Sequence, residues 1–222
     1  MNTLFIRLEG PLQSWGTRAR WGDRDTALEP TKSGVVGLLA CALGWGRQHD
    51  REIRDLGLAL EFGVRVDRPG QVLRDYHTVV GGTMSAAGKV KINQNTGEPE
   101  TVVSPRFYLA DASFLAAVRG EASLIAQLAA ALREPVWPLY LGRKSCPPSV
   151  HPFEGTGQFS TLLEALATWP RSPRAADGAL RAVLEVAPGQ GVRRMDQIDV
   201  LTLRRYMPRF SRDVQVDPPP AQ

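Results

Sequence analysis

The sequence predicts an α+β fold in which two helices pack on one face of an antiparallel sheet. Apolar and polar residues alternate over residues 3–9, 58–66 and 102–111, as expected for half-buried strands. Residues 30–46 and 121–133 instead carry apolar residues at helical spacing. With a short strand after the second helix, the order is strand, helix, strand, strand, helix, strand. That order is typical of a ferredoxin-like or RRM-type sandwich.

The first predicted strand, residues 3–9, has two different faces. Leu4, Ile6 and Leu8 point to one side and are expected to be buried. The opposite side carries an aromatic residue and charged residues, namely Phe5, Arg7 and Glu9. We expect this second face to be open.

The loop after this strand combines basic and aromatic residues. Gly10 and Pro11 end the strand, and Gln13 and Trp15 then supply a polar donor and a stacking surface. Interleaved cations and rings are typical of proteins that bind single-stranded nucleic acid. Alternatively, the tryptophans pack the loop onto the core and the arginines are merely solvated. The residues concerned are Trp15, Arg18, Arg20, Trp21 and Arg24.

The helix predicted over residues 30–46 is apolar almost all the way round, which indicates burial against the sheet. Thr31 is suited to cap its start. Lys32 and Ser33 then place a cation and a hydroxyl beside the unpaired N–H groups of the first turn, which is a candidate phosphate seat. An ordinary capped core helix explains the same residues. The order of residues does not fit the Walker A nucleotide-binding motif.

The segment between this helix and the next strand, residues 45–56, is interpreted as a polar connection. Beyond the strand at 58–66, Asp75, Tyr76 and His77 follow one another. A tyrosine and a histidine near a carboxylate can perform acid–base chemistry, although such residues more often form a structural hydrogen-bonded pair.

Residues 81–100 form the tract least typical of a core before the C-terminal tail. Lys89 and Lys91 flank apolar residues and a turn sequence follows, so we interpret the tract as a mobile protruding hairpin, with a disordered loop as the alternative. The strand predicted at 102–111 comes next and carries Arg106 on one face.

The second half of the chain begins with the helix at 121–133 and a short strand predicted at 136–141. The glycine-started loop that follows, residues 142–149, offers two cations and a hydroxyl, and its N–H groups can form a phosphate nest. The groups are those of Arg143, Lys144 and Ser145. Farther along we expect a helix at 161–168, a strand at 179–187, a basic tail at 193–212 and a frayed C-terminus.

Composition narrows the class of protein. The chain has 222 residues, 43% of them hydrophobic, which is enough for one substantial core. A net charge of +4 permits a polyanionic partner without requiring one. Cys41 and Cys146 have neither disulfide-framework nor metal-site spacing, and no apolar run approaches the length of a membrane span. We expect a cytoplasmic protein with reduced thiols, no membrane association, and no cofactor or metal.

Several of these segments, in the same order along the chain, resemble the CasD-type subunits of the CRISPR Cascade complex, which belong to the RAMP superfamily. The type I-E branch is the most similar. Each motif alone is modest, but their shared order and spacing are specific. The motifs are GPLQSWG at 10–16, PTKSGVVGLLACALG at 30–44, LRDYHTV at 73–79, SPRFYLAD at 104–111 and LYLGRKSCPPS at 139–149.

The resemblance implies a ferredoxin-like RAMP domain over residues 1–150, with a β-hairpin thumb at about 81–100, and a smaller C-terminal extension at 151–222. It also implies a non-catalytic subunit that binds the 5′ handle of CRISPR RNA and supports antiviral defence. Its partners would be the backbone subunit and the large subunit of Cascade, with target DNA reached only through the complex. The implied RNA contacts are Gln13, Trp15, Lys32, Ser33, Lys89, Lys91, Arg106, Arg143, Lys144 and Ser145.

Two other functions remain open from the sequence. In the related type I-C branch the corresponding subunit cuts precursor CRISPR RNA without a metal, and Tyr76, His77 and Lys144 offer comparable groups here. No Lys-His adjacency occurs in the sequence, which speaks against cutting. A protein-only assembly scaffold, whose basic loops meet acidic protein surfaces, is the second alternative.

Overall fold

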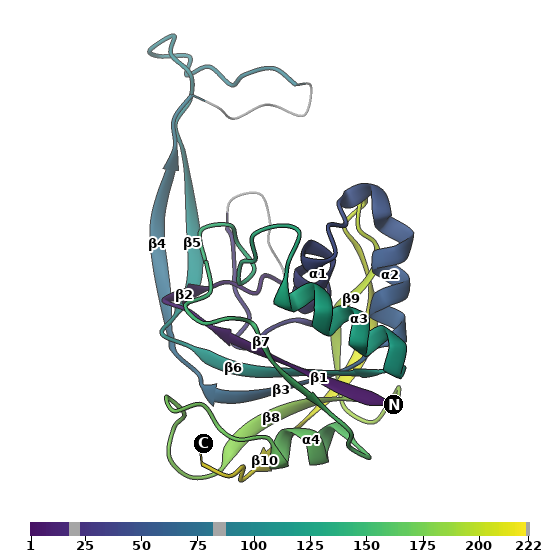
Figure 1. Ribbon diagram of the computed structural model, residues 1–222. Helices are drawn as coiled ribbons and strands as arrows, with labels where there is room; N and C mark the ends of the chain where they lie inside the picture. The colour runs from purple at the N-terminus through teal and green to yellow at the C-terminus, as the bar shows by residue number, and fades with distance from the viewer. Residues whose placement is uncertain (18–22, 82–87, 221–222) are drawn as a thin grey trace.

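The computed structural model describes residues 1–17, 23–81 and 88–220. Within these residues the chain forms a seven-stranded sheet and a three-stranded sheet, and all pairs of strands are antiparallel (Figure 1). The larger sheet has the order β7 (Phe153–Gly157), β1 (Asn2–Glu9), β6 (Ser113–Gly120), β3 (Glu61–Arg68), β8 (Leu180–Val186), β10 (Arg205–Val216) and β9 (Val192–Val200). The smaller sheet has the order β2 (Leu12–Gln13), β5 (Val102–Ala110) and β4 (Gln71–Val79).

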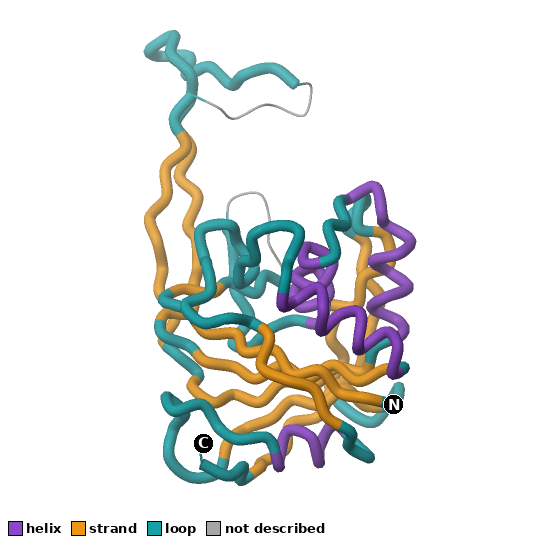
Figure 2. The backbone as a smooth tube through the Cα atoms, viewed as in Figure 1, coloured by secondary structure: helices purple, strands orange, loops and turns teal. Residues whose placement is uncertain are grey.

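The helices cover both faces of the larger sheet (Figure 2). One face packs against α1 (Lys32–Ala42), α2 (Asp50–Ala59) and α3 (Ala122–Arg133), with a short 3₁₀ helix (Arg47–His49) before α2. The other face packs against α4 (Leu162–Thr168). Among the described residues, no helix is long and apolar enough to cross a membrane.

Two apolar cores follow from the alternation along β1. Ile6 belongs to the same core as Leu39 of α1 and Ile125 of α3, whereas its neighbour Phe5 belongs to the core that contains Leu166 of α4. Successive side chains of a strand point to opposite faces, so β1 contributes to both cores. The two helices predicted at 30–46 and 121–133 thus lie on one face, and α4, the helix predicted at 161–168, covers the other.

The second face of β1 is closed rather than open, which corrects the expectation for Phe5, Arg7 and Glu9. These side chains are at most 6% exposed because α4 and the segment at 169–176 lie over them. The ring of Phe5 stacks on Trp169 with centroids 3.9 Å apart. A buried arginine and glutamate require partners, and this segment supplies several of them.

The segment interpreted as a polar connection at 45–56 contains the start of α2. Ile53, Leu56 and Gly57 lie on the buried side of the helix, while its polar residues face outward. Because α2 continues to Ala59, the following strand β3 begins at Glu61 rather than at Leu58. The polar composition concealed a narrow apolar stripe.

Strand β6 was not predicted, and the strand predicted at 136–141 does not form. β6 is central and buried, so its apolar run shows no alternation. In the 136–141 segment, Pro138 lacks the N–H that a strand ladder needs. The segment runs along α1 instead, and the Val136 N–H donates to the Ala42 carbonyl at 3.0 Å.

The chain beyond residue 150 supplies β7, β8, β9 and β10 to the same sheet as β1, β3 and β6. The basic tail forms the β9–β10 hairpin. The terminal segment is held as far as Pro219, whose carbonyl accepts from the Arg171 N–H at 3.0 Å. The division of the chain at residue 150 remains a prediction.

Strands β4 and β5 form a long ribbon that projects from the body (Figure 1). The hairpin predicted at 81–100 lies at its tip, where Ile92 and Pro99 form an isolated bridge, and the paired strands lie on either side of that range. Residues 82–87 of the predicted hairpin fall outside the described residues.

Candidate nucleic-acid interface

A cavity of about 450 Å³ lies between α1, the loop at 14–16 and the loop at 137–142. Ser33 and Cys41 of α1 line it together with several aromatic rings, two of which are substantially exposed. The aromatic residues are Trp15, Trp45, Trp137, Tyr140 and Tyr206. Rings around an open cavity offer stacking surfaces for unpaired bases.

The two loops that wall this cavity are locked together. The Ser14 N–H donates to the Leu141 carbonyl at 3.0 Å. Gly142 has a φ of +89°, and a Cβ at that position would lie 1.8 Å from the Ser14 carbonyl oxygen. Only glycine fits this close approach. The loop that follows therefore starts from a fixed point beside the cavity.

Arg143 brings the basic residues of three segments together. Its Nη2 donates to the carbonyls of Arg24 at 2.8 Å and Asp25 at 3.3 Å, and its guanidinium lies 4.7 Å from the centre of the Tyr108 ring. Arg24 in turn forms a parallel bridge with Arg106 on β5. We refer to Arg24, Arg106, Arg143 and Lys144 as the basic cluster.

Two nitrogen atoms of the basic cluster remain unsatisfied. Arg106 Nε and Arg143 Nη1 are buried and find no hydrogen-bond partner among the described residues. A buried guanidinium nitrogen without an acceptor is costly, by about 1–3 kcal/mol. Phosphate matches guanidinium geometry well, although buried nitrogens without a partner in the described part of the chain also occur on Arg54 and Arg119, away from this cluster.

Lys144 connects the basic cluster to the cavity. Burial raises the pKa of the Cys41 thiol, while the hydrogen bond to Tyr140 and the charge of Lys144 oppose that rise. Lys144 follows two positions after Gly142, which lines the cavity, and its side chain is exposed. Ser145 next to it is also exposed, with its hydroxyl 3.9 Å from the Cys146 sulfur.

Lys32 occupies a different environment from the basic cluster. Its side chain is buried, and Nζ donates to both carboxylate oxygens of Glu185 at 2.9 and 3.0 Å. Burial lowers the pKa of Lys32 more than Glu185 raises it. The ammonium is thus already paired inside the protein, and we do not retain Lys32 as a direct RNA contact.

The candidate phosphate seat at the start of α1 is likewise filled by the protein itself. The Lys32 N–H donates to Asp196 Oδ2 at 3.0 Å, and the Gly34 N–H donates to Thr31 Oγ1 at 3.2 Å. Asp196 is also ion-paired with Arg209. Carboxylates at a helix start satisfy the same N–H groups that would bind a phosphate. Ser33 still lines the cavity with its side chain half-buried.

We predict that Lys32→Ala lowers the free energy of unfolding by about 1–3 kcal/mol, because it leaves the Glu185 carboxylate without its main partner. Urea unfolding measures this loss. RNA affinity of the folded protein should be unchanged. A variant of unaltered stability that no longer bound RNA would contradict this assignment.

Gln13 and Trp15 are interior residues that support the cavity. Trp15 is 1% exposed, and its indole N–H donates to Gln13 Oε1 at 3.1 Å. Gln13 Nε2 donates to the carbonyls of Leu8 at 3.0 Å and Ala112 at 2.9 Å. All polar atoms of the Gln13 side chain are therefore engaged, and we do not retain these two residues as direct RNA contacts.

The remaining predicted residues lie on the ribbon. Lys89 and Lys91 are exposed near its tip. Tyr76 and His77 are consecutive on β4, so their side chains point to opposite faces. His77 Nδ1 lies 3.7 Å from Asp75 Oδ2. Arg18, Arg20 and Trp21 of the basic loop fall outside the described residues.

Sequence reasoning missed Trp45, Trp137 and Tyr206 as members of the site. Trp137 was assigned to a strand that does not form, and Trp45 was placed in a connection. Tyr206 lies in β10 but reaches the cavity, which only the folding of the C-terminal hairpin brings about. The only sequence feature that pointed to Tyr206 as a site residue was its position among the arginines of the basic tail.

Comparison of the sequence with known proteins gives two matches, and both are to CRISPR-associated proteins. A family model described as CRISPR-associated protein (Cas_Cas5) matches residues 3–216. The Escherichia coli (strain K12) protein named CRISPR system Cascade subunit CasD is 38% identical over 178 residues, which cover 75% of this chain and 76% of the relative. The resemblance drawn from the sequence motifs is thereby confirmed.

Solved structures agree with these matches. A crystal structure of a Cas protein superposes with a TM-score of 0.74 and 38% identity, covering 99% of this chain and 98% of the other. A chain of a CRISPR RNA-guided surveillance complex gives a TM-score of 0.74 and 33% identity, covering 98% of this chain and 91% of the other. This chain and the two solved structures therefore share the mixed α/β architecture.

Proposed function

Because this chain belongs to the CRISPR-associated protein (Cas_Cas5) family, we propose that it is the CasD-type subunit of a type I-E surveillance complex. In this role it binds and caps the 5′ handle of CRISPR RNA without cutting it, and it supports antiviral defence. Its partners are the backbone and large subunits, and target DNA is reached only through the complex. The proposal includes a ferredoxin-like body and use of the β4–β5 ribbon as the thumb.

The observation that carries the proposal is the convergence of the basic cluster beside the aromatic cavity. Arg106 and Arg143 are 37 positions apart in the sequence, yet Arg143 lies over the ring of Tyr108 on the same strand as Arg106. Both have a buried nitrogen that lacks an acceptor among the described residues. Cations for phosphates and rings for bases thus adjoin one another, as single-stranded RNA requires.

The mechanism is binding without turnover. The guanidinium groups of Arg106 and Arg143 and the ammonium of Lys144 neutralise handle phosphates and fix the path of the backbone. Splayed bases enter the aromatic cavity, where Trp137 and Tyr206 are exposed enough to stack on them. Ser33 and the loop N–H groups supply polar contacts to base edges.

The positions of Tyr76 and His77 support a subunit that does not cut RNA. Their side chains leave opposite faces of β4. Lys144 is on the loop beside α1, near Cys41. A general acid and base must reach the same reacting group, and these residues do not converge on one point. Incubation with labelled precursor RNA in EDTA should leave the RNA intact.

We predict that Lys144→Ala weakens binding of CRISPR RNA by about tenfold, the value expected for one charge-assisted contact. The slope of log affinity against log salt should fall by about 0.7. Both effects should be equal for the natural handle and a scrambled handle, because phosphate contacts carry no sequence information. Fluorescence anisotropy with the assembled complex measures them.

Arg212→Ala is the matched control, because this exposed arginine on β10 lies outside the basic cluster and its removal changes the net charge equally. It should leave affinity and salt slope unchanged. Trp137→Ala should instead lower the affinity for both handles while leaving the salt slope unchanged, because stacking involves no phosphate. If Arg212→Ala and Lys144→Ala lost RNA affinity equally, binding would depend on net charge alone, and the proposed site would be wrong. A discrete cut in EDTA, abolished by His77→Ala, would make the protein an endoribonuclease instead.

A further inference from the structure

The ribbon joins the body through two turns that lie side by side. The chain enters β4 through Arg68, Pro69 and Gly70, and it leaves β5 through Asp111. Gly70 has a φ of +70°, and a Cβ there would lie 2.5 Å from the Ala110 carbonyl oxygen. The two crossings therefore touch at the base of the ribbon, and together they form its hinge.

An acidic side chain at this hinge is gripped from two sides. Asp111 Oδ2 pairs with Arg68 Nη2 at 2.5 Å, and Asp111 Oδ1 pairs with Arg174 Nη2. Arg174 also pairs through Nη1 with Glu9 Oε1 at 3.0 Å. Burial would raise the pKa of Glu9, but the hydroxyl of Ser113 and the charge and hydrogen bond of Arg174 lower it. The hinge is thereby tied both to β1 and to the segment at 169–177, which follows α4 and is called the C-terminal segment below.

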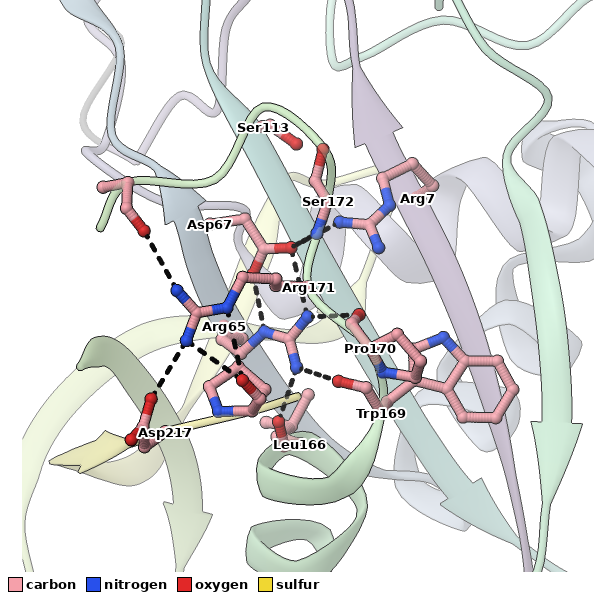
Figure 3. A network of polar contacts seen from close by, with 12 residues as sticks. Arg7, Arg65, Asp67, Ser113, Leu166, Trp169, Pro170, Arg171, Ser172 and Asp217 are labelled. Atoms are coloured by element: carbon pink, nitrogen blue, oxygen red, sulfur yellow. Dashed lines mark hydrogen bonds and ion pairs between the residues drawn. The ribbon is translucent and has the colours of Figure 1, made fainter. Parts of the chain in front are cut away.

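The segment that carries Arg174 is itself firmly anchored to the sheet (Figure 3). Arg65 is fully buried and donates to the carbonyls of Leu166, Trp169 and Pro170 at 2.6–2.8 Å. The Ser172 N–H donates to Asp67 Oδ2 at 2.8 Å. Arg174 is therefore presented to the hinge from a rigid support.

Packing alone does not fill the space beneath the ribbon. An apolar cleft of about 350 Å³ lies between its base and the C-terminal segment. The cleft is lined by Pro69, Val72 and Leu109 on one side and by Ala176 and Leu180 on the other. On the β5 edge, strand β2 holds the ribbon, whereas β4 is the outer strand of the small sheet. Because packing does not fill the cleft, contacts other than apolar packing must resist tilting of the ribbon toward it.

We propose that Asp111, Arg68 and Arg174 form an ion-pair clamp that sets the direction of the ribbon relative to the seven-stranded sheet. The C-terminal segment at 169–177 acts through Arg174 as the positioning element. In this way the last third of the chain determines where the ribbon tip points. The inference goes beyond the proposed function and does not depend on it.

Distances between spin labels test the clamp in the free, full-length protein. Labels are placed at Thr78→Cys on β4 and Leu163→Cys on α4, both exposed positions, in a Cys41→Ser background where the other cysteine, Cys146, is fully buried. The labelled protein should give a single narrow distance distribution. Asp111→Asn removes the charge but tolerates the positive φ, and it should broaden the distribution at least about twofold. Arg174→Ala should do the same.

Arg171→Ala is the matched control. Arg171 is in the same segment but holds Asp217 and the Pro218 carbonyl, not the hinge, so its removal should leave the distribution narrow. The clamp side chains are 39–48% exposed, so raising the salt from about 0.1 M to about 1 M should broaden the distribution of the unsubstituted protein. This salt titration decides the matter even if a variant does not fold.

Unchanged distributions in Asp111→Asn and Arg174→Ala, or equal broadening in Arg171→Ala, would overturn the clamp. Insensitivity of the unsubstituted protein to salt would do so as well. The measurement contains neither RNA nor other subunits. Failure of the clamp would therefore leave the proposed RNA binding intact, and failure of RNA binding would leave the clamp intact.

Discussion

Replacing Asp67 with asparagine is expected to lower the free energy of unfolding by about 3–5 kcal/mol, the cost of breaking a buried ion pair from one side. The Asp67 carboxylate is fully buried and accepts from Arg65 Nε at 2.5 Å, Arg7 Nη1 at 2.7 Å and the Ser172 N–H at 2.8 Å. Figure 3 shows these donors converging on it. An amide cannot neutralise two guanidinium groups, so both charges would remain buried without adequate compensation.

Urea unfolding at pH 7 measures the change, and Asp217→Asn serves as its control. Asp217 also pairs with an arginine of the C-terminal segment, but its side chain is 80% exposed. Loss of an exposed pair should cost at most about 1 kcal/mol. Similar stabilities for the two variants would mean that the buried network contributes no more than a surface pair.

The same carboxylate predicts how stability depends on pH. Burial would raise the pKa of Asp67, but hydrogen bonds and charges from Arg65 and Arg7 outweigh it, and the pKa lies below its ordinary value. A carboxyl group whose pKa is lowered by folding stabilises the protein above its unfolded value, and the contribution is lost as the pH falls through the folded value. Stability should therefore decline below about pH 4 and decline less steeply in Asp67→Asn.

The sequence predicted those elements whose burial leaves a recognisable periodic or apolar pattern along the chain. Strand β1 and helix α1 carry strong alternation or a long apolar run, and both form as expected. β6 escaped because a strand buried on both faces has no alternation to detect. The opposite error was made with β1, where Arg7 was assigned to open solvent. Its partners Asp67 and Glu154 are 60 and 147 positions away, and no local pattern reveals them.

The same distinction explains what could be predicted of the site. Lys144, which was predicted from a glycine-started loop, is exposed, and Arg143 beside it is half-buried against Tyr108, so both stay candidate contacts. Lys32 looked equally available, but Glu185 and Asp196 lie 153 and 164 positions farther along the chain. The sequence shows that a lysine is present, whereas only the tertiary structure shows whether its ammonium group is already paired with a carboxylate.

Trp15→Ala is expected to lower the free energy of unfolding by about 3–5 kcal/mol, as for other buried tryptophans. Trp15 is 1% exposed and packs under the first turn of α1, so closely that a Cβ on Gly34 would lie 2.8 Å from its ring. The substitution removes a large ring and leaves Gln13 Oε1 without the indole N–H. Thermal and urea unfolding measure the loss, and RNA binding should fall in parallel because the cavity wall collapses.

Comparison with Trp137→Ala separates support of the cavity from stacking on a base. Trp137 lines the same cavity but is 41% exposed, so its removal should change stability by no more than about 0.5 kcal/mol. If Trp137 stacks on RNA, its variant loses affinity at full stability, at about 1–3 kcal/mol per base. Trp15→Phe keeps most of the packing and should retain both stability and affinity. A stable Trp15→Phe that lost RNA binding would instead assign Trp15 a direct contact and require the loop at 14–16 to open when RNA binds.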